Sequence, residues 1–438
     1  MKARLCAVLL VGCSLTEVPA LAQDTADQNI AIHGQMTFVL QANSHFRSPY
    51  QGANSLDHRA HAKETFDLTA YLGFRPWAGA EIWVNPEIDQ GFGLSNTLGA
   101  AGFPSGEAYK VGKTNPYAKL PRWFLRQTID LAGEREKIDP GLNQLGGHQG
   151  TDRVVLWLGK FSVVDVFDTN DQAHDPRSDF MNWTIIDAGT FDYAANAWGY
   201  TYGAAAELYQ GHWAVRAGAF DLSDVPNSIR LDPTFGQHEL DGEIEHRHSI
   251  GGRPGKVKVT LFVNHGRMGL FADALSLAEK TGGPVDITAV RRKRDRAGVS
   301  FNVEQQVLDD ASVFLKGGVT NGGIEPYEFT DVDRSLSAGM TIKGKAWGRP
   351  GDTIGLAGGV NSITGVHKRF LDAGGLGILI GDGKLPHPGS EQIVEGYYDL
   401  ALLNQMHVSI DGQLIRRPGY NRDRGPVPIG AVRIHAEF

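Results

Sequence analysis

The sequence has almost no cysteine and, beyond its first residues, no long hydrophobic run. Its two cysteines, Cys6 and Cys13, both fall in the N-terminal stretch, so a chain processed after them has no thiol, no disulfide and no cysteine metal site. No later stretch approaches the roughly 18 consecutive apolar residues that a membrane helix requires. If the protein spans a membrane, it must do so with strands, because only helices and closed barrels satisfy their backbone hydrogen bonds in lipid.

The N-terminus has the pattern of a secretion signal. A basic start precedes an apolar run from Leu5 to Gly12, and the small-residue pattern Ala20-Leu21-Ala22 is typical of a signal-peptidase site. We therefore predict a signal peptide over residues 1–22. The segment Leu10-Val11-Gly12-Cys13 also resembles a lipoprotein cleavage site, which leaves lipidation of its cysteine as the alternative.

The chain without this signal is acidic, with 40 basic and 49 acidic side chains and a formal charge of −9. This charge argues against nucleic acid as a partner, because proteins that bind DNA or RNA neutralise phosphates with Lys and Arg. A soluble chain of this length would need two or three domains, since a single core rarely exceeds about 250–300 residues. A large barrel escapes that limit because it has no single core.

Alternating apolar and polar residues predict β-strands along the whole chain. The last stretch, Gly430–Phe438, has one apolar face that ends on the terminal phenylalanine, while Arg433, His435 and Glu437 lie on the other face. A strand with lipid on one side and a wet lumen on the other has this pattern. On either side of the turn at residues 75–79, the chain alternates in the same way, which predicts a hairpin.

Sixteen such strands are predicted, joined by short and long connections in alternation. They cover residues 30–41, 65–74, 80–89, 122–131, 153–161, 200–208, 213–220, 240–250, 256–264, 296–306, 311–319, 335–344, 352–361, 391–402, 406–414 and 429–438. An even number of roughly ten-residue strands, with short turns at one end and long loops at the other, is what a closed outer-membrane barrel requires. We therefore predict an all-β fold, a transmembrane antiparallel β-barrel of about 16 strands that forms one domain over residues 23–438.

Two features of the strand pattern leave the count open. The number becomes eighteen if Leu376–Ile380 is a strand with a further partner. The connection 132–152 is long for a turn at the short-turn end, and the strand 153–161 is apolar on both faces. Closure of the sheet is still expected, because the edges of so large an open sheet would promote aggregation.

The faces predicted to line the lumen are polar and carry both signs of charge. An ion-selective channel would show one sign at its constriction, so a mixed wall suits neutral polar solutes. Sugar recognition uses amides, carboxylates and arginines for hydroxyl groups, with aromatic faces for the sugar ring. Such residues cluster in and beside the long loops 90–121 and 162–199, which we expect either to cover the mouth or to fold into the lumen.

The remaining motifs do not support an enzyme, a cofactor or a metal site. Asp168–Ala173 begins like a calcium loop but lacks the glycine and the glutamate of that motif. His246 and His248 share one strand face without an evident third ligand. We interpret the basic run Arg291–Arg296 as a contact with anionic lipid headgroups or phosphates at the membrane surface.

Five long segments carry a resemblance to a known family. They are NPEIDQGFGLSNTLGAAGFPSGEAYKVG from Asn85, PRWFLRQTIDL from Pro121, LGKFSVVDVFDTNDQAHDPRSDFMNW from Leu158, FLDAGGLGILIGDGKL from Phe370 and QLIRRPGYNRDRGPV from Gln413. In these segments the chain resembles the carbohydrate-selective porins of Gram-negative outer membranes, the OprB family. The resemblance implies a sixteen-stranded barrel with extracellular loops folded inward to narrow the channel, and passive uptake of mono- or small oligosaccharides. It also implies that the barrel-assembly machinery recognises the strand ending at Phe438.

Together these observations predict a carbohydrate-selective porin of the Gram-negative outer membrane that is not an enzyme and holds no cofactor or metal. The residues predicted to bind substrate at its constriction are Glu81, Asn85, Glu87, Arg122, Arg126, Asp130, Lys160 and Trp183. The expected partners are small sugars, outer-membrane lipid and lipopolysaccharide, and the barrel-assembly machinery, for a monomer or a homotrimer. The alternative functions are a general non-selective porin and a barrel that exports or scaffolds a polysaccharide, which would need a wide lumen with charge of one sign.

Overall fold

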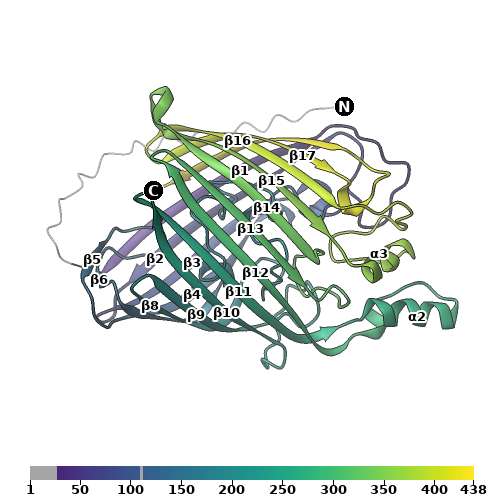
Figure 1. Ribbon diagram of the computed structural model, residues 1–438, viewed down its shortest axis with the longest axis horizontal. Coiled ribbons are helices and arrows are strands. Elements are labelled where there is room, and N and C mark those ends of the chain that lie inside the picture. Colours follow the sequence, from purple (N-terminus) through teal and green to yellow (C-terminus); the bar gives the residue numbers. More distant parts are fainter. Residues whose placement is uncertain (1–26, 109–111) are drawn as a thin grey trace.

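A computed structural model shows the alternating strands closed into one barrel (Figure 1). It describes residues 27–108 and 112–438, so the predicted signal peptide 1–22, with Cys13, lies outside the described residues. The predicted fold class and the count of sixteen wall strands are confirmed. Leu376–Ile380 is irregular chain, so it adds no strand to the wall.

The wall strands are long and antiparallel. They are β1 (Ile30–Asn43), β2 (His61–Phe74), β3 (Ala80–Gly91), β4 (Lys113–Asp130), β7 (Arg153–Phe161), β8 (Thr201–Gln210), β9 (Trp213–Asp221), β10 (His238–Ile250), β11 (Arg253–Met268), β12 (Arg292–Leu308), β13 (Ala311–Thr320), β14 (Arg334–Gly344), β15 (Arg349–Ser362), β16 (Glu391–Leu403), β17 (Met406–Arg416) and β18 (Val427–Glu437). Their order around the barrel is β1-β18-β17-β16-β15-β14-β13-β12-β11-β10-β9-β8-β7-β4-β3-β2.

The largest difference from the predicted boundaries is at the start of β4. The sequence pattern placed that start at residue 122, whereas the strand begins at Lys113. Pro116 and Pro121 interrupt the pattern, because proline cannot donate a hydrogen bond to a neighbouring strand. A register shift on β3 between Asn85 and Glu87 accommodates this part of β4.

The barrel closes between its first and last strands, as predicted. Gln35 of β1 lies opposite Glu437 of β18 in antiparallel register. On β18, Arg433 is only 1% exposed on the lumen side, whereas Val432 is 41% exposed on the outer face and Phe438, directly after the strand, is 63% exposed. The apolar face of this strand therefore meets lipid and the charged face meets the lumen.

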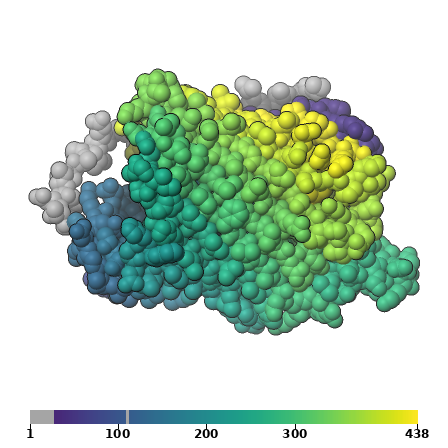
Figure 2. All heavy atoms as spheres, in the orientation of Figure 1, coloured from purple at the N-terminus to yellow at the C-terminus, as the bar shows by residue number. Residues whose placement is uncertain are grey.

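Short turns join the strands at one end of the barrel, and longer connections lie at the other end. The longer connections contain α1 (Trp183–Ile186), α2 (Phe271–Thr281) and α3 (Gly365–Asp372), and the last two project at the right of Figure 1. Short 3-10 turns are η1 (Leu94–Thr97), η2 (Val163–Asp165), η3 (Thr288–Val290), η4 (Lys345–Trp347) and η5 (Pro418–Tyr420). Among the described residues, no helix is long and apolar enough to cross a membrane. In the space-filling view the side of the barrel that faces the reader is a continuous wall, with the loop that contains α2 projecting from it (Figure 2).

The connection between β4 and β7 forms a small sheet of its own at the short-turn end. β5 (Arg135–Ile138) and β6 (Gly147–Gly150) pair antiparallel and are separate from the barrel wall. They lie at the left of Figure 1, at the same end as the C-terminus. Strands this short carry too little alternation to be predicted from the sequence.

Two long connections fold into the lumen and fill much of it, as predicted. We call residues 92–108 and 162–200 the plug, and most of their side chains are buried. Phe167 of the plug packs edge-to-face on Phe220 of β9, with ring centroids 6.0 Å apart, and Phe161 of β7 lies 5.7 Å from the same ring. This packing explains why β7 is apolar on both faces: Phe161 is fully buried against the plug, while Leu158 is 61% exposed on the outer face.

Candidate solute path in the lumen

A cavity of about 690 Å³ lies in the lumen beside β3, β4, β7, β8 and β9. Charged and aromatic side chains make up most of its wall: Glu81, Arg126, Arg153, Trp157, Asp165, Glu207, Tyr209 and Arg216. Leu145 and His148, from the chain between β4 and β7, line the part of the cavity at the short-turn end. The cavity therefore lies between the plug and one half of the barrel wall.

Glu81 and Arg126 form one charged pair in this wall. They are cross-strand partners on β3 and β4, and Nη2 of Arg126 donates to Oε2 of Glu81 at 2.7 Å. The same carboxylate oxygen accepts Nε1–H of Trp83 at 2.9 Å and the backbone N–H of Leu145 at 3.1 Å. The guanidinium of Arg126 also lies 5.2 Å from the centre of the Trp157 ring. The register of three neighbouring strands, β3, β4 and β7, thus places a carboxylate, a guanidinium and an aromatic ring together.

Glu207 and Arg216, cross-strand partners on β8 and β9, form a second charged pair. Nε of Arg216 donates to Glu207 at 2.8 Å, the hydroxyl of Tyr209 donates to it at 2.6 Å, and Nε1 of Trp157 donates at 2.8 Å. The Glu207 carboxylate is therefore fully occupied by donors. The wall carries both signs of charge, and Arg126 and Arg216 are each paired with a carboxylate.

Arg122 of β4 binds Asp165, a plug residue that lines the cavity. Nε and Nη2 donate to the two carboxylate oxygens at 2.9 and 2.7 Å, a forked geometry that lysine cannot provide. The carboxylate is held in place locally, because it also accepts the N–H of Ser162 at 2.9 Å in a capping box at η2. The guanidinium lies 4.9 Å from the centre of the Tyr200 ring. The side chains of the pair are 12% and 23% exposed, so water reaches both charges.

A denser group of charges surrounds Lys119 and Arg177. Nζ of Lys119 lies 3.1 Å from Glu87 and 2.9 Å from Asp89. Arg177 of the plug lies 3.2 Å from Glu107 and 3.8 Å from Glu87. Burial by itself lowers the pKa of Arg177, but the surrounding carboxylates, Glu107 first, outweigh it and raise that pKa well above its ordinary value. The lumen therefore keeps a permanent positive charge among these acids.

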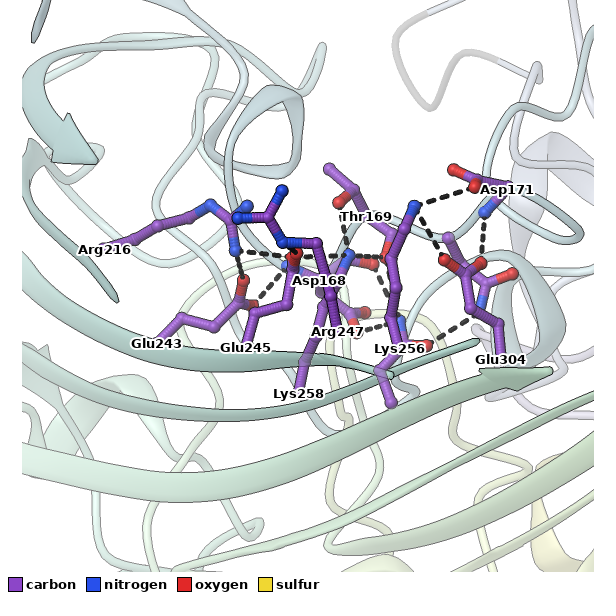
Figure 3. Close-up of polar contacts among 12 residues, drawn as sticks. Asp168, Thr169, Asp171, Arg216, Glu243, Glu245, Arg247, Lys256, Lys258 and Glu304 are labelled. Atoms are coloured by element: carbon purple, nitrogen blue, oxygen red, sulfur yellow. Dashed lines mark hydrogen bonds and ion pairs between the residues drawn. The ribbon is translucent and has the colours of Figure 1, made fainter. Parts of the chain in front are cut away.

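The plug is anchored to the opposite half of the barrel wall (Figure 3). Glu243 of β10 accepts the N–H of Asp168 at 2.8 Å, and Nζ of Lys258 on β11 donates to Oγ1 of Thr169 at 2.5 Å and to its carbonyl oxygen. Six more charged residues on β12, β13, β16 and β18 bind plug residues: Arg296, Glu304, Lys316, Glu391, Glu395 and Arg433. Because these anchors lie on β10–β18, the cavity is left on the side of β3–β9.

Most of the predicted constriction residues face the lumen. Four of them form the ion pairs described above: Glu81, Glu87, Arg122 and Arg126. Asn85 also faces inward, but its amide donates to Asn143 of the chain between β5 and β6 at 2.9 Å. Asp130 lies at the short-turn rim, where its carboxylate accepts the N–H of Gly150 at 2.8 Å. Asn85 and Asp130 therefore hold the chain between β4 and β7 at the short-turn end of the cavity.

The structure places two predicted residues elsewhere. Lys160 lies in the cross-strand row Trp123–Lys160–Tyr202, and its Nζ is 5.8 Å from the Tyr202 ring. Trp123 is 44% and Tyr202 37% exposed, so this row faces outward and Lys160 does not line the lumen. Trp183 is 5% exposed and stacks on Phe103 within the plug at 4.9 Å, away from the open cavity.

Sequence reasoning missed Trp157, Asp165, Glu207 and Arg216. The alternation of β8 and β9 carried a usable signal for two of them, because Glu207 and Arg216 are charged residues on strands whose other face is mostly apolar. Asp165 carried no such signal, since its position depends on the path of a long loop through the lumen.

Comparisons with known proteins agree with this architecture. Residues 53–438 match the family model described as "Carbohydrate-selective porin, OprB family". The high-pH structure of Pseudomonas putida OprB is 16% identical over 94% of this chain and 94% of that chain, with a TM-score of 0.71. The outer membrane channel DcaP of Acinetobacter baumannii is 11% identical over 95% of this chain and 100% of that chain, with a TM-score of 0.55. No curated protein matches the sequence.

The two structural likenesses show the shared barrel fold, and the family match covers most of the chain. A porin of this kind is an outer-membrane β-barrel of Gram-negative bacteria and not an enzyme. The chain belongs to the OprB family of carbohydrate-selective porins.

Proposed function

We propose that this porin lets mono- or small oligosaccharides diffuse passively into the periplasm along the cavity beside β3, β4, β7, β8 and β9. The observation that supports this proposal is the cavity wall, in which paired carboxylates and guanidinium groups surround the Trp157 ring. A sugar hydroxyl both donates and accepts, so it can bind a carboxylate and an arginine at once. The apolar face of a sugar ring finds its match on an aromatic side chain.

Weak binding follows from the way these charges are already paired. Arg126 bonds Glu81, and Arg216 bonds Glu207, before any solute enters. A sugar therefore exchanges hydrogen bonds with groups that are already satisfied, and the net gain is small. Passage needs this balance, because a solute must bind well enough to enter and weakly enough to leave.

The proposed route runs from the long-loop end, which is the extracellular end in a porin, to the short-turn end. Of the residues predicted to bind substrate, the proposal keeps Glu81, Arg122 and Arg126, and it adds Asp165 and Trp157. Asp165, held by Arg122, lines the cavity on its plug side, and the chain between β4 and β7 borders the exit.

The same proposal covers processing, assembly and surroundings. We infer that residues 1–22 are a secretion signal and that 23–438 form the barrel domain. The backbone N–H of Phe438 donates to the carbonyl of Gly34 at 2.9 Å, so a terminal strand recognised by the assembly machinery would end paired with β1. Outer-membrane lipid and lipopolysaccharide would surround the apolar wall.

The experiment is sugar permeation through the purified porin and through two matched tryptophan variants. Glucose and maltose should swell liposomes that contain the parent protein, and sugar should reduce ion current in a planar bilayer. Trp157→Ala should weaken the sugar effect on current about fivefold, the equivalent of ~1 kcal/mol for one aromatic contact. Trp213→Ala removes a ring that is 52% exposed on the outer face and should leave the sugar effect unchanged.

Two results would reject the proposal. The first is that neither glucose nor maltose permeates the parent protein or changes its ion current. The second is equally fast permeation of charged and neutral solutes of one size, which would make the protein a general non-selective porin.

A further inference from the structure

The basic run Arg291–Arg296 does not form one patch in the fold. Its first and fourth members are held by carboxylates of neighbouring loops. Nε of Arg291 donates to Glu325 at 2.9 Å, and Nη2 of Arg294 donates to Asp273 at 2.8 Å. These two arginines therefore stabilise the extracellular loops and are not free to bind an external anion.

Two other members of the run, Lys293 and Arg296, lie on opposite faces of β12. Arg296 is fully buried in the lumen, with Nη1 2.5 Å from Asp192. Lys293 points outward and lies directly opposite Arg267 of β11. Both of these cations are exposed, and Nζ of Lys293 donates to the carbonyl of Gly236 at 2.9 Å.

This outward pair of like charges is not paired with an acid: within residues 27–108 and 112–438, no carboxylate forms an ion pair with Arg267 or Lys293. Asp295, on the same face, is engaged by Nδ1 of His265 at 2.6 Å. Asp232, in the loop close to Gly236, accepts the hydroxyl of Thr234 at 2.7 Å. Like charges directly opposite on neighbouring strands destabilise a sheet, so an anion bound between them would stabilise it.

The pair lies at the level of lipid headgroups. On β11 the outward residues Leu261 and Val263 are 58% and 38% exposed and belong to the aliphatic belt. Arg267 is four residues beyond Val263 towards the extracellular loops, roughly 13 Å along the strand. Phosphates of anionic lipids occupy this zone, just outside the hydrocarbon layer.

An apolar groove of about 700 Å³ runs over the outer face of β3, β4, β7, β8 and β9, and its edge at Phe235 comes close to the cation pair. Its wall includes Trp123, Leu158, Tyr202, Ala204, Ala219 and Phe235. Phe235 is 48% exposed and directly precedes Gly236, whose carbonyl holds Lys293. A ligand for this surface therefore needs both a negatively charged head and a hydrocarbon chain.

We propose that the extracellular ends of β9–β12 bind an anionic glycolipid of the outer leaflet. Its phosphate lies between Arg267 and Lys293, and an acyl chain descends into the groove past Phe235. The site is separate from the lumen and does not depend on which solute the channel carries.

The test is binding of lipopolysaccharide with a bisphosphorylated lipid A to the purified porin in non-ionic detergent, measured with a fluorescent label. With about 1 kcal/mol for each cation, Arg267→Gln or Lys293→Gln should weaken binding about fivefold, and the double variant about 30-fold. Ala204→Phe, which fills the groove, should weaken glycolipid binding but not competition by inorganic phosphate. Lys345→Gln, at an exposed lysine of the periplasmic turn η4, is the matched control and should bind like the parent.

Unchanged ion conductance and unchanged heat-modifiable migration will show that each variant is folded. The proposal is overturned if the double variant binds within twofold of the parent, or if Lys345→Gln loses as much affinity. It is also overturned if lipid A without phosphates binds as tightly as the phosphorylated form. A change of oligomeric state in the double variant, without loss of glycolipid binding, would make this face a contact between porin chains instead.

Discussion

Replacing Arg122 with methionine removes the positive charge that is paired with Asp165, a residue that lines the cavity, and leaves that carboxylate unpaired. The side chains of the pair are only 12% and 23% exposed, but Asp165 borders the cavity, so the dielectric constant of water gives a lower bound for the effect of this charge on a passing ion. A unit charge about 4 Å from an ion in water contributes about 1 kcal/mol, which is about fivefold in a permeability ratio. Arg122→Met should therefore shift the ratio of cation to anion permeability about fivefold towards cations. The reversal potential in a KCl gradient measures this ratio.

Two control variants separate local charge from other effects. Arg122→Met combined with Asp165→Asn restores the charge balance and should return the permeability ratio close to that of the parent. Lys160→Met removes the same charge from a side chain on the outer face and should leave the ratio unchanged. If Lys160→Met shifts selectivity as far as Arg122→Met, or if the double variant stays cation-selective, the Arg122–Asp165 pair does not border the conducting path.

Two further predictions concern the plug. Arg296→Met leaves the fully buried Asp192 carboxylate without its cation and should destabilise the barrel by about 3–5 kcal/mol, seen as a lower temperature for the heat-induced shift in gel migration. The matched variant Arg253→Met breaks an exposed pair with Asp309 and should cost about 0–1 kcal/mol. Burial, helped by the charge of a neighbouring aspartate, raises the pKa of Asp187 to about 8. The folded state therefore favours its protonated form, and the stability that this group contributes is lost as the pH rises from 3.8, its ordinary pKa, to about 8. The transition temperature should fall over that range in the parent and much less in Asp187→Asn, and equal pH dependence in both proteins would rule out this carboxyl as the cause.

The barrel could be predicted from the sequence because lipid imposes one requirement on every strand. Whatever the lumen contains, the side chains that face the hydrocarbon layer are predominantly apolar, and residues such as Ile410 and Val394 are 67% and 52% exposed on that face. The pattern failed only where this requirement does not act. β5 and β6 lie outside the wall, and the first part of β4 contains prolines at Pro116 and Pro121.

For the candidate site, the sequence could predict which face of its strand a residue occupies only where that strand alternates clearly. The inward placement of Glu81 and Arg126 could be predicted because each alternates with lipid-facing residues on its own strand. Lys160 was misplaced because β7 is apolar on both faces, so alternation did not say which face met lipid. Trp183 and Asp165 depend on how a long loop crosses the lumen, which is decided by contacts with strands far away in the sequence.

The partners of the buried charges show why the cavity lies to one side of the lumen. An irregular loop inside a barrel exposes backbone N–H and C=O groups that need partners, because an unpaired buried group costs free energy. On one half of the wall, Glu391 accepts the N–H of Gly102 at 2.7 Å, and Arg433 donates to the carbonyl of Asp179 at 2.7 Å. On the other half, Arg126 donates to a side chain, Glu81. Charged residues lie on both halves, so composition alone does not tell them apart. Charges bonded to the plug are anchors, and charges on neighbouring strands that bond to one another, such as Arg126 and Glu81, line the cavity of the proposed solute route.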